Sequence, residues 1–277
     1  MTHPVLEARG LAKRYRRRVW ALSGIDLDIS AGGITALVGP NAAGKSTLIK
    51  TWVGFEKPTR GSVRVADIDP WKDRSAALAH LGYVPQSPVL YDGLTVEDHL
   101  ALARQLRPDF DREYARARLA QLEIPADRGG RDLSGGQQAQ VALALALGTR
   151  APILLLDEPL ASLDPLARRE FLHVLTDAVR TDGATALLSS HIVTDVEQAC
   201  DRLIVLGVGR VLLHDTVSGA LEAHAISTVE RPDAVGSFGA PDGSRIYLVR
   251  GSADRPATLD EVVLGYLASG RSKAVAA

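Results

Sequence analysis

The stretch Gly39-Pro40-Asn41-Ala42-Ala43-Gly44-Lys45-Ser46-Thr47 fits the phosphate-loop pattern G-x-x-x-x-G-K-[ST]. The apolar run at residues 34–38 before it predicts a buried strand, and residues 46–52 behind it predict the start of a helix. A glycine-rich loop between a strand and a helix directs several backbone N–H groups at one place, where the helix dipole already favours an anion. Lys45 would add a point charge for outer phosphates, and the Ser46 hydroxyl would ligate Mg²⁺. The competing interpretation is a chance glycine turn, which the strand–loop–helix context disfavours.

The composition is that of an ordinary globular protein. At 277 residues the chain has room for one large domain or two unequal ones, and 46% of its residues are hydrophobic. The formal net charge of −1 gives no global case for nucleic acid or an anionic membrane as a partner, although Lys13-Arg14-Tyr15-Arg16-Arg17-Arg18 is locally basic. A single cysteine, Cys200, excludes an internal disulfide and suits a reducing cytosol. The apolar runs fall short of the roughly 20 residues of a membrane span, so we expect membrane contact only through a partner.

The pattern of apolar residues divides the chain into three regions. Residues 5–9, 25–29 and 62–68 alternate as half-buried strands do, which predicts a small sheet around the phosphate-loop strand. Helices follow, one capped by Thr95 and Asp98 and ending near residue 107, and another capped by Asp111. Continuous apolar runs at residues 153–156 and 185–188 predict central parallel strands, joined by a crossover helix at residues 165–180. Residues 203–206 and 210–213 predict a hairpin.

The last part of the chain differs in composition. Residues 224–244 are rich in Gly, Pro, Asp and Ser, and residues 246–249 predict a strand. Thr258 and Glu261 form a capping-box pattern ahead of an apolar face with helical spacing. We expect a small appendage over residues 224–277, whose function is not evident and which would serve as a packing element.

Two carboxylates follow the buried run at residues 153–156. Asp157 and Glu158 would lie at the carboxyl edge of an α/β sheet, where ligands bind. Because Mg²⁺ prefers hard oxygen ligands and substrate phosphates, Asp157 is a candidate for holding the metal. Glu158 would polarise a water for in-line attack on a γ-phosphate. Paired with the phosphate loop, this acidic turn predicts phosphoryl chemistry.

The stretch Leu133-Ser134-Gly135-Gly136-Gln137 is the most discriminating. Ser134 and Gln137 form a capping-box pattern before an apolar helix at residues 141–147, which by itself indicates only a capped helix. It also resembles the signature of ABC-type ATPases, and the motif order agrees with that family. The resemblance covers nearly all of residues 5–215. It implies an α/β P-loop NTPase of ABC type: a mainly parallel core sheet flanked by helices, an N-terminal antiparallel β subdomain, and a helical signature subdomain at about residues 87–150. The ATPase domain would span residues 1–223.

The same resemblance implies a set of site residues for ATP and Mg²⁺. Tyr15 stands where the family has an adenine-stacking aromatic, Gln86 matches the glutamine loop, and His191 the switch histidine; Ser162-Leu163-Asp164 matches a loop at the dimer interface. Ordinary strand packing is the alternative for Tyr15 and an exposed loop amide for Gln86. The full expectation is that catalysis depends on Glu158, His191, Gln86 and Lys45, that Mg²⁺ is held by Ser46, Gln86 and Asp157, and that nucleotide contacts come from Tyr15, Gly39, Pro40, Asn41, Ala42, Ala43, Gly44, Lys45, Ser46, Thr47, Gln86, Ser134, Gly135, Gly136, Gln137, Asp164 and His191.

The chain departs from the family at two places. Family members usually carry Gly at the position of Ala42, so a positive φ there would cost on the order of 1 kcal/mol. Gln138-Ala139-Gln140 follows the signature where an Arg is common, which puts charge-assisted contacts of that helix in doubt. We expect ATP hydrolysis to survive both changes.

The resemblance also implies how the protein acts. Two subunits, as a homodimer or as a paired heterodimer, would pack head to tail with ATP between them and drive a separate membrane permease. The stretch from Leu154 to Glu197 most resembles exporter ATPases of the drug, antibiotic or membrane-peptide type, which predicts a cytoplasmic protein peripheral on the inner face of the membrane. The alternative is a non-transport ABC ATPase acting on ribosomes or DNA. No nucleic acid is expected, since a tandem second domain and a long coiled coil are both absent from the sequence. A generic P-loop kinase or GTPase would lack the signature, the glutamine loop and the switch histidine.

Overall fold

The computed structural model describes residues 3–15, 19–87, 90–161, 163–240 and 242–275. The predicted basic residues Arg16, Arg17 and Arg18, and Ser162 of the predicted dimer-interface loop, lie outside the described residues. Within the described residues, no helix is long and apolar enough to cross a bilayer.

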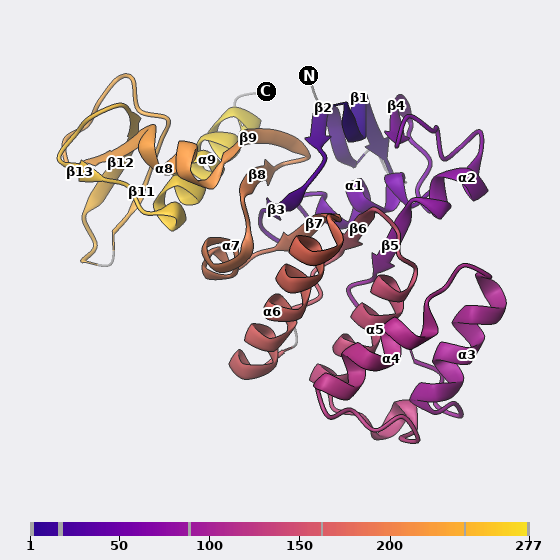
Figure 1. Cartoon of the computed structure of the whole chain (residues 1–277). Coiled ribbons are helices and arrows are strands. Elements are labelled where there is room, and N and C mark those ends of the chain that lie inside the picture. Colours follow the sequence, from indigo (N-terminus) through magenta and orange to yellow (C-terminus); the bar gives the residue numbers. More distant parts are fainter. Residues whose placement is uncertain (1–2, 16–18, 88–89, 162, 241, 276–277) are drawn as a thin grey trace.

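A six-stranded sheet of order β5-β6-β7-β3-β8-β9 forms the centre of the molecule (Figure 1). Its strands are β5 (Leu81–Val84), β6 (Ile153–Leu156), β7 (Thr185–Ser190), β3 (Gly33–Val38), β8 (Arg202–Gly207) and β9 (Arg210–Thr216). All neighbours pair in parallel except β8 and β9, which form the predicted antiparallel hairpin. The continuous apolar sequences of β6 and β7 are buried at every residue, as expected for central strands covered on both faces. This mainly parallel core confirms the predicted α/β class.

A second sheet of order β2-β1-β4 covers one face of the core with α1 (Lys45–Trp52). Its strands β1 (Pro4–Arg14), β2 (Trp20–Ser30) and β4 (Arg60–Val65) are antiparallel, as predicted for the N-terminal sheet. The predicted strand at residues 62–68 is wrong at its end. Ala66 and Asp67 have positive φ, and Val65 and Ile68 close a tight turn with reciprocal backbone hydrogen bonds of 2.8 Å. Val63 and Val65 fit the alternation of a strand, whereas Ile68 falls one residue out of phase with them.

Helices α5 (Gly135–Gly148) and α6 (Pro165–Asp182) cover the other face of the core sheet. Helices α3 (Val96–Leu106) and α4 (Arg112–Gln121) pack with one side of α5 around a separate apolar cluster. Thr95 and Asp111 cap α3 and α4 as predicted, because each side chain accepts a hydrogen bond from a backbone N–H in the first turn. The remaining short elements before α6 are α2 (Arg74–Ala79) and η2 (Gly130–Asp132).

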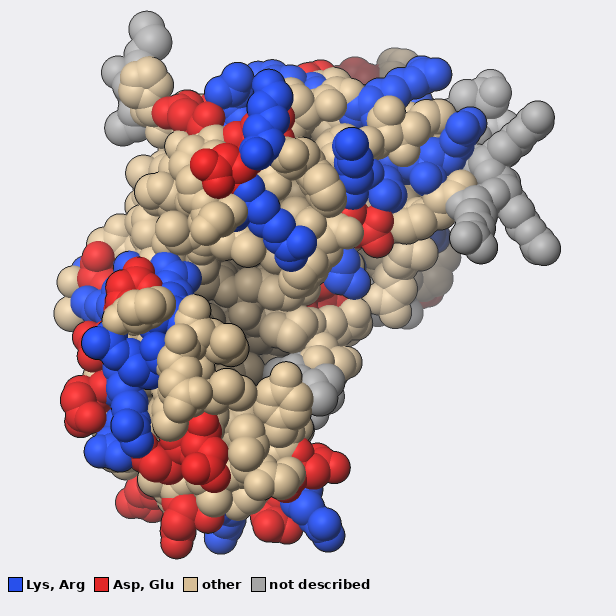
Figure 2. All heavy atoms as spheres, turned by 90° about the vertical axis from the view of Figure 1, so that its right-hand side faces the viewer, with Lys and Arg blue, Asp and Glu red and all other residues tan. Residues whose placement is uncertain are grey.

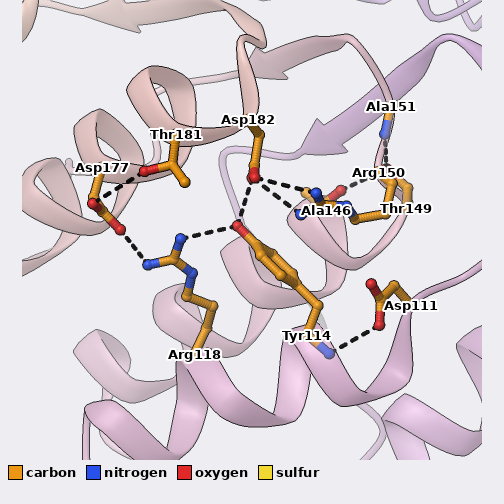
Figure 3. A network of polar contacts seen from close by, with 10 residues as sticks. All are labelled: Asp111, Tyr114, Arg118, Ala146, Thr149, Arg150, Ala151, Asp177, Thr181 and Asp182. Atoms are coloured by element: carbon orange, nitrogen blue, oxygen red, sulfur yellow. Dashed lines mark hydrogen bonds and ion pairs between the residues drawn. The ribbon is translucent and has the colours of Figure 1, made fainter.

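Polar contacts tie this helical region to α6 (Figure 3). The Tyr114 hydroxyl of α4 donates to Asp182 at 2.7 Å and accepts from Arg118 at 3.1 Å. Arg150, which follows α5, places both terminal nitrogens 3.1 Å from the Asp182 carboxylate and lies over the Tyr114 ring. Arg118 also pairs with Asp177 of α6. Tyr114 therefore joins α4 to the end of α6 and to the segment that follows α5.

From His224 onward the chain forms a four-stranded sheet of order β11-β12-β10-β13 with α9 (Leu259–Val275) packed on it. The strands are β10 (His224–Ser227), β11 (Gly236–Gly239), β12 (Arg245–Arg250) and β13 (Arg255–Pro256). The predicted capping box of α9 is present between Thr258 and Glu261. Apolar residues of this appendage share one cluster with β3, β8, β9, α7 (Val193–Ala199) and α8 (Val217–Glu222), so it packs directly on the core.

Candidate active site

The phosphate loop turns from β3 into α1 through residues with unusual backbone conformations. Gly44 has φ 108°, and a Cβ there would lie 2.5 Å from the Ala21 carbonyl oxygen, so the position demands glycine on two grounds. Ala42 has φ 65°, which is the left-handed conformation that glycine favours. The substitution therefore carries the strain of about 1 kcal/mol that a Cβ incurs there.

Lys45 is the central cation of the loop. Its side chain is 3% exposed, and its ammonium donates to the Gly39 carbonyl at 2.6 Å and the Pro40 carbonyl at 3.2 Å. The third contact is an ion pair of 2.9 Å with Glu158, whose side chain is 8% exposed. Both charges are buried, and each compensates the other's desolvation.

Asp157 lies opposite the first turn of α1. One of its carboxylate oxygens accepts from the Ser46 hydroxyl at 2.8 Å and from Ser189 at 3.3 Å, while the other, Oδ2, is buried without a hydrogen-bond partner. Burial raises the pKa of Asp157, and the hydrogen bond from Ser46 opposes that rise. Within the described residues no three His, Cys, Asp or Glu side chains gather in a way that could hold a metal. A buried oxygen with free lone pairs next to a hydroxyl suits Mg²⁺, which takes few protein ligands and completes its shell with phosphate and water.

Glu158 adopts a backbone conformation rare for its residue type, with φ 46°. Its backbone N–H donates to the Ser189 hydroxyl at 2.7 Å, which fixes the turn after β6. The side chain reaches Lys45 on one side and lies 3.5 Å from Nδ1 of His191 on the other. His191 itself is 42% exposed. Strain at such a position is held by the surrounding structure and is characteristic of functional sites.

A cavity of about 370 Å³ lies over the loop and brings together many of the predicted residues. It is lined by Tyr15, Val19, Trp20, Ala21, Asn41, Ala42, Ala43, Gly44, Lys45, Ser46, Thr47, Gln86 and Glu158. The Tyr15 hydroxyl lies 3.5 Å from that of Thr47, and burial raises the tyrosine pKa. Trp20 was not predicted as a site residue. It is the cross-strand neighbour of Arg14, whose guanidinium lies 5.3 Å from the indole centroid, and only this pairing with β1 brings it beside Tyr15.

The signature residues lie elsewhere. Ser134, Gly135, Gly136 and Gln137 are not among the residues that line the cavity. The predicted capping box is present, because Gln137 N–H donates to the Ser134 hydroxyl at 3.2 Å and Ser134 N–H donates to the Gln137 side chain at 3.0 Å. A Cβ on Gly135 would meet nothing within 4 Å, so the helix start is open to an approaching group. Asp164 also lies apart and caps α6 through bonds of 3.0 Å from the N–H groups of residues 166 and 167.

The helix behind the signature carries the second departure from the family. Gln140 is 4% exposed, and neither atom of its amide has a hydrogen-bond partner among the described residues. The position therefore makes no polar contact that would replace those of an arginine.

Comparisons with known proteins agree with this geometry. Residues 22–161 match the family model described as ABC transporter. The chain is 31% identical to the phosphonates import ATP-binding protein PhnC of Thiobacillus denitrificans, over 83% of this chain and 94% of that protein. It is 33% identical to the lipopolysaccharide export system ATP-binding protein LptB of Acidithiobacillus ferridurans, over 75% of this chain and 88% of that protein. Among solved structures it resembles the dimeric ATP-binding cassette MJ0796 in a post-hydrolysis state with ADP and Pi, at 26% identity and a TM-score of 0.68, over 76% of this chain and 98% of that one.

Proposed function

Because this chain belongs to the ABC transporter family, whose ATP-binding subunits hydrolyse ATP to energise transport through a membrane permease, we propose that it is the ATPase subunit of an exporter. The observation that carries the ATPase mechanism is the convergence of Lys45, Ser46 and Glu158 on one cavity, with Asp157 bonded to Ser46 behind its wall. The ATPase domain of this proposal is residues 1–223, with its helical subdomain at about residues 87–150 and the appendage at residues 224–277.

The phosphate loop would hold the triphosphate. Gly44 and the first residues of α1 line the cavity, so their backbone N–H groups would bind phosphate oxygens and Lys45 would supply the charge for the outer phosphates. Ser46 and Asp157, together with Gln86, are the residues that would hold Mg²⁺, which when bound neutralises charge on the phosphate oxygens. Tyr15 would stack on the adenine at the mouth of the cavity.

Glu158 would act as the general base. Its carboxylate is held between Lys45 and His191, so it is positioned to accept a proton from the attacking water once the triphosphate engages Lys45. His191 would contact the γ-phosphate from the opposite side, and Gln86 would report on it from the segment that leads into the helical subdomain. The roles of these side chains follow from the family resemblance and fit their positions around the cavity.

A second ATPase subunit would complete the site. The start of α5 is open, carries Ser134 and Gly135, and lies away from the cavity of its own chain. Packed head to tail, it would present its N–H groups to the γ-phosphate bound by the partner. Asp164 would lie at the same interface. ATP then holds two copies together, and hydrolysis releases them.

The permease would contact the side of the molecule that carries α2 and α3. Figure 2 shows a hollow without charged side chains between the upper and lower parts of this side. Exposed apolar side chains come from the segments around it, with Phe55 55% exposed after α1 and Leu106 77% exposed at the end of α3. Phe55 also packs edge-on against Tyr83, three residues before Gln86, which would link the permease to the nucleotide.

We also propose a direction of transport, which is export. It is supported by the resemblance of residues 154–197 to exporter ATPases, whereas relatives at similar identity are named for import and for export. We expect the protein to be cytoplasmic and bound to the inner face of the membrane only through its permease, with no nucleic acid partner.

Affinity purification of tagged Glu158→Gln protein from detergent-solubilised cells, with ATP present, tests the proposal. We expect a stoichiometric multi-span membrane protein, and ATP-driven movement of substrate out of whole cells, or into inverted membrane vesicles, then fixes the direction. Recovery of ribosomes or DNA-bound factors with no membrane chain would instead favour the non-transport alternative. Net ATP-driven uptake into whole cells through this pair would contradict export while leaving the ATPase assignment intact.

A further inference from the structure

A cavity of about 390 Å³ lies where β9 of the core sheet meets the appendage. It is lined by Leu212 of β9, Ala234, Val235, Arg250 of β12, and Tyr266 and Ser269 of α9. Its volume is within the range of small-molecule sites, and its wall combines apolar side chains with a few polar groups, as such sites do. Nothing in the proposed ATPase mechanism uses it.

Small residues of α9 create this space. A Cβ on Gly270 would lie 2.8 Å from the Leu212 side chain, and one on Gly236 would lie 2.1 Å from the Gly265 carbonyl oxygen. Gly270 therefore allows α9 to pack closely against β9, and Gly236 allows β11 to pack closely against α9. At neighbouring positions, the short side chains of Ser269 and Ala234 leave the cavity between these close contacts.

The polar end of the cavity has a fixed order of hydrogen bonds. Nδ1 of His224 lies 2.7 Å from the Ala220 carbonyl, which only accepts, so Nδ1 carries the proton. Nε2 then accepts from the Tyr266 hydroxyl at 3.1 Å, and that hydroxyl accepts from Arg250 at 3.1 Å. Tyr266 is 6% exposed, whereas Arg250 is exposed.

The Arg250 guanidinium uses one N–H group in the hydrogen bond to Tyr266, and its other N–H groups can bind a ligand. The carboxylate of Asp215 acts on this guanidinium from beyond ion-pair distance. A guanidinium offers its remaining N–H groups in a planar fork that matches a carboxylate. The charged end of the cavity thus suits an anion, while Leu212 and Val235 suit an apolar chain.

We propose that this cavity binds a small organic carboxylate with a short apolar tail, and that the ligand modulates nucleotide binding. The carboxylate would pair with Arg250 beside the Tyr266 hydroxyl. The tail would lie against Leu212, Ala234 and Val235, where it is removed from water. This assignment goes beyond the proposed transport function and does not depend on which substrate is moved.

The β8–β9 hairpin connects this cavity to the phosphate loop. Gly209, three residues before Leu212, donates its N–H to the Ala43 carbonyl at 3.1 Å. On the same hairpin, the Leu206 carbonyl would lie 2.2 Å from a Cβ on Gly39, so the two backbones are in close contact. A ligand that presses on Leu212 acts on a rigid element that supports the loop directly, and the two binding equilibria become coupled.

Titration calorimetry with sodium octanoate on the full chain tests the site. We expect one octanoate per chain and no binding of octylammonium, which has the same number of carbon atoms and the opposite charge. Arg250→Gln should weaken octanoate binding at least tenfold, whereas Arg245→Gln, an exposed arginine on the same strand, should leave it unchanged. Ser269→Leu, which fills the cavity without touching the guanidinium, should abolish binding even if Arg250→Gln proves unstable. Equal octanoate binding by wild type, Arg250→Gln and Ser269→Leu would overturn the site.

A second experiment measures the coupling between octanoate binding and nucleotide binding. Saturating octanoate should change the affinity for ADP by threefold or more in wild type and leave it unchanged in Ser269→Leu, and by linkage ADP should change octanoate affinity by the same factor. If saturating octanoate leaves the ADP affinity of the wild type unchanged, the cavity ligand does not modulate nucleotide binding and this part of the proposal is refuted. Because ADP binding needs neither hydrolysis nor the permease, failure of the export proposal would not affect this result.

Discussion

Changing Glu158 to Gln should do two things at once, because its carboxylate has two partners. On one side it pairs with Lys45 at 2.9 Å, and on the other it lies 3.5 Å from His191. Gln keeps the shape of the side chain and one acceptor oxygen but loses the charge and the basicity. Hydrolysis should fall by about 10²–10⁴-fold, the usual contribution of a general base.

Nucleotide affinity should rise in the same variant. The Glu158 carboxylate pairs with Lys45, so a triphosphate must displace it or share the ammonium with it. A hydrogen bond to a charged group contributes about 1.5–3 kcal/mol. Since Lys45 keeps its bonds to the carbonyls of Gly39 and Pro40, we take the low end, and about 1.5 kcal/mol corresponds to roughly tenfold tighter binding.

The assay uses a non-hydrolysable ATP analogue with Mg²⁺, so that slower turnover cannot imitate tighter binding. Calorimetric Kd values would be compared for wild type, Glu158→Gln and the matched control His191→Ala. The control removes the other partner of the carboxylate and leaves the Lys45 pair intact, so its hydrolysis should fall without the gain in affinity.

Two results would refute the reasoning. Equal analogue affinity in Glu158→Gln and wild type would mean that the ion pair with Lys45 does not compete with phosphate. Undiminished turnover in Glu158→Gln would remove Glu158 from the role of base.

Three further changes test separate parts of the site. Lys45→Ala should weaken ATP binding by tenfold or more in equilibrium dialysis, since the outer phosphates lose their charged donor; unchanged affinity would contradict that role. Ser134→Ala should abolish turnover while a single chain still binds nucleotide, and a variant that hydrolyses normally would remove the signature from the mechanism. Tyr114→Phe removes the hydrogen bond from α4 to Asp182 of α6 and the bond from Arg118 within α4, about 1 kcal/mol, and should lower the melting temperature by about 2–4 °C; no shift would show that these bonds of the Tyr114 hydroxyl in Figure 3 are not stabilising.

The parts of the fold that the sequence predicted are those with a local cause. The phosphate loop, the buried runs at residues 153–156 and 185–188, and the caps Thr95 and Asp111 each carry their explanation within a few residues. The end of β4 was predicted wrongly because the apolar Ile68 extends the run past Val65, although it is one residue out of phase and follows a turn with positive φ at Ala66 and Asp67. The ion pair of Lys45 with Glu158 was not anticipated, since it depends on β3 and β6 lying on either side of β7 in the sheet.

The residues that sequence reasoning missed share a dependence on tertiary contacts. Trp20 lines the cavity only because β2 pairs with β1 at Arg14, and no motif marks it. Tyr114 reads as one aromatic of an ordinary helix until α4 and α6 are brought together. Gly209 sits in a common hairpin turn, and its bond to the phosphate loop becomes visible only when the hairpin lies beneath that loop.

The position of the hairpin has a consequence for how the appendage could affect the ATPase. The loop is strained at Ala42 and relies on neighbours to hold its shape, and Gly209 is one of those neighbours. Leu212 on the same hairpin fits between Gly207 and Gly270, where an added Cβ would lie 2.6 and 2.8 Å from its side chain. A packed element of this kind moves as a unit rather than deforming continuously. A small shift of α9 would therefore be transmitted through the β8–β9 hairpin to Ala43. By this route the appendage would influence the conformation of the phosphate loop as well as cover the sheet.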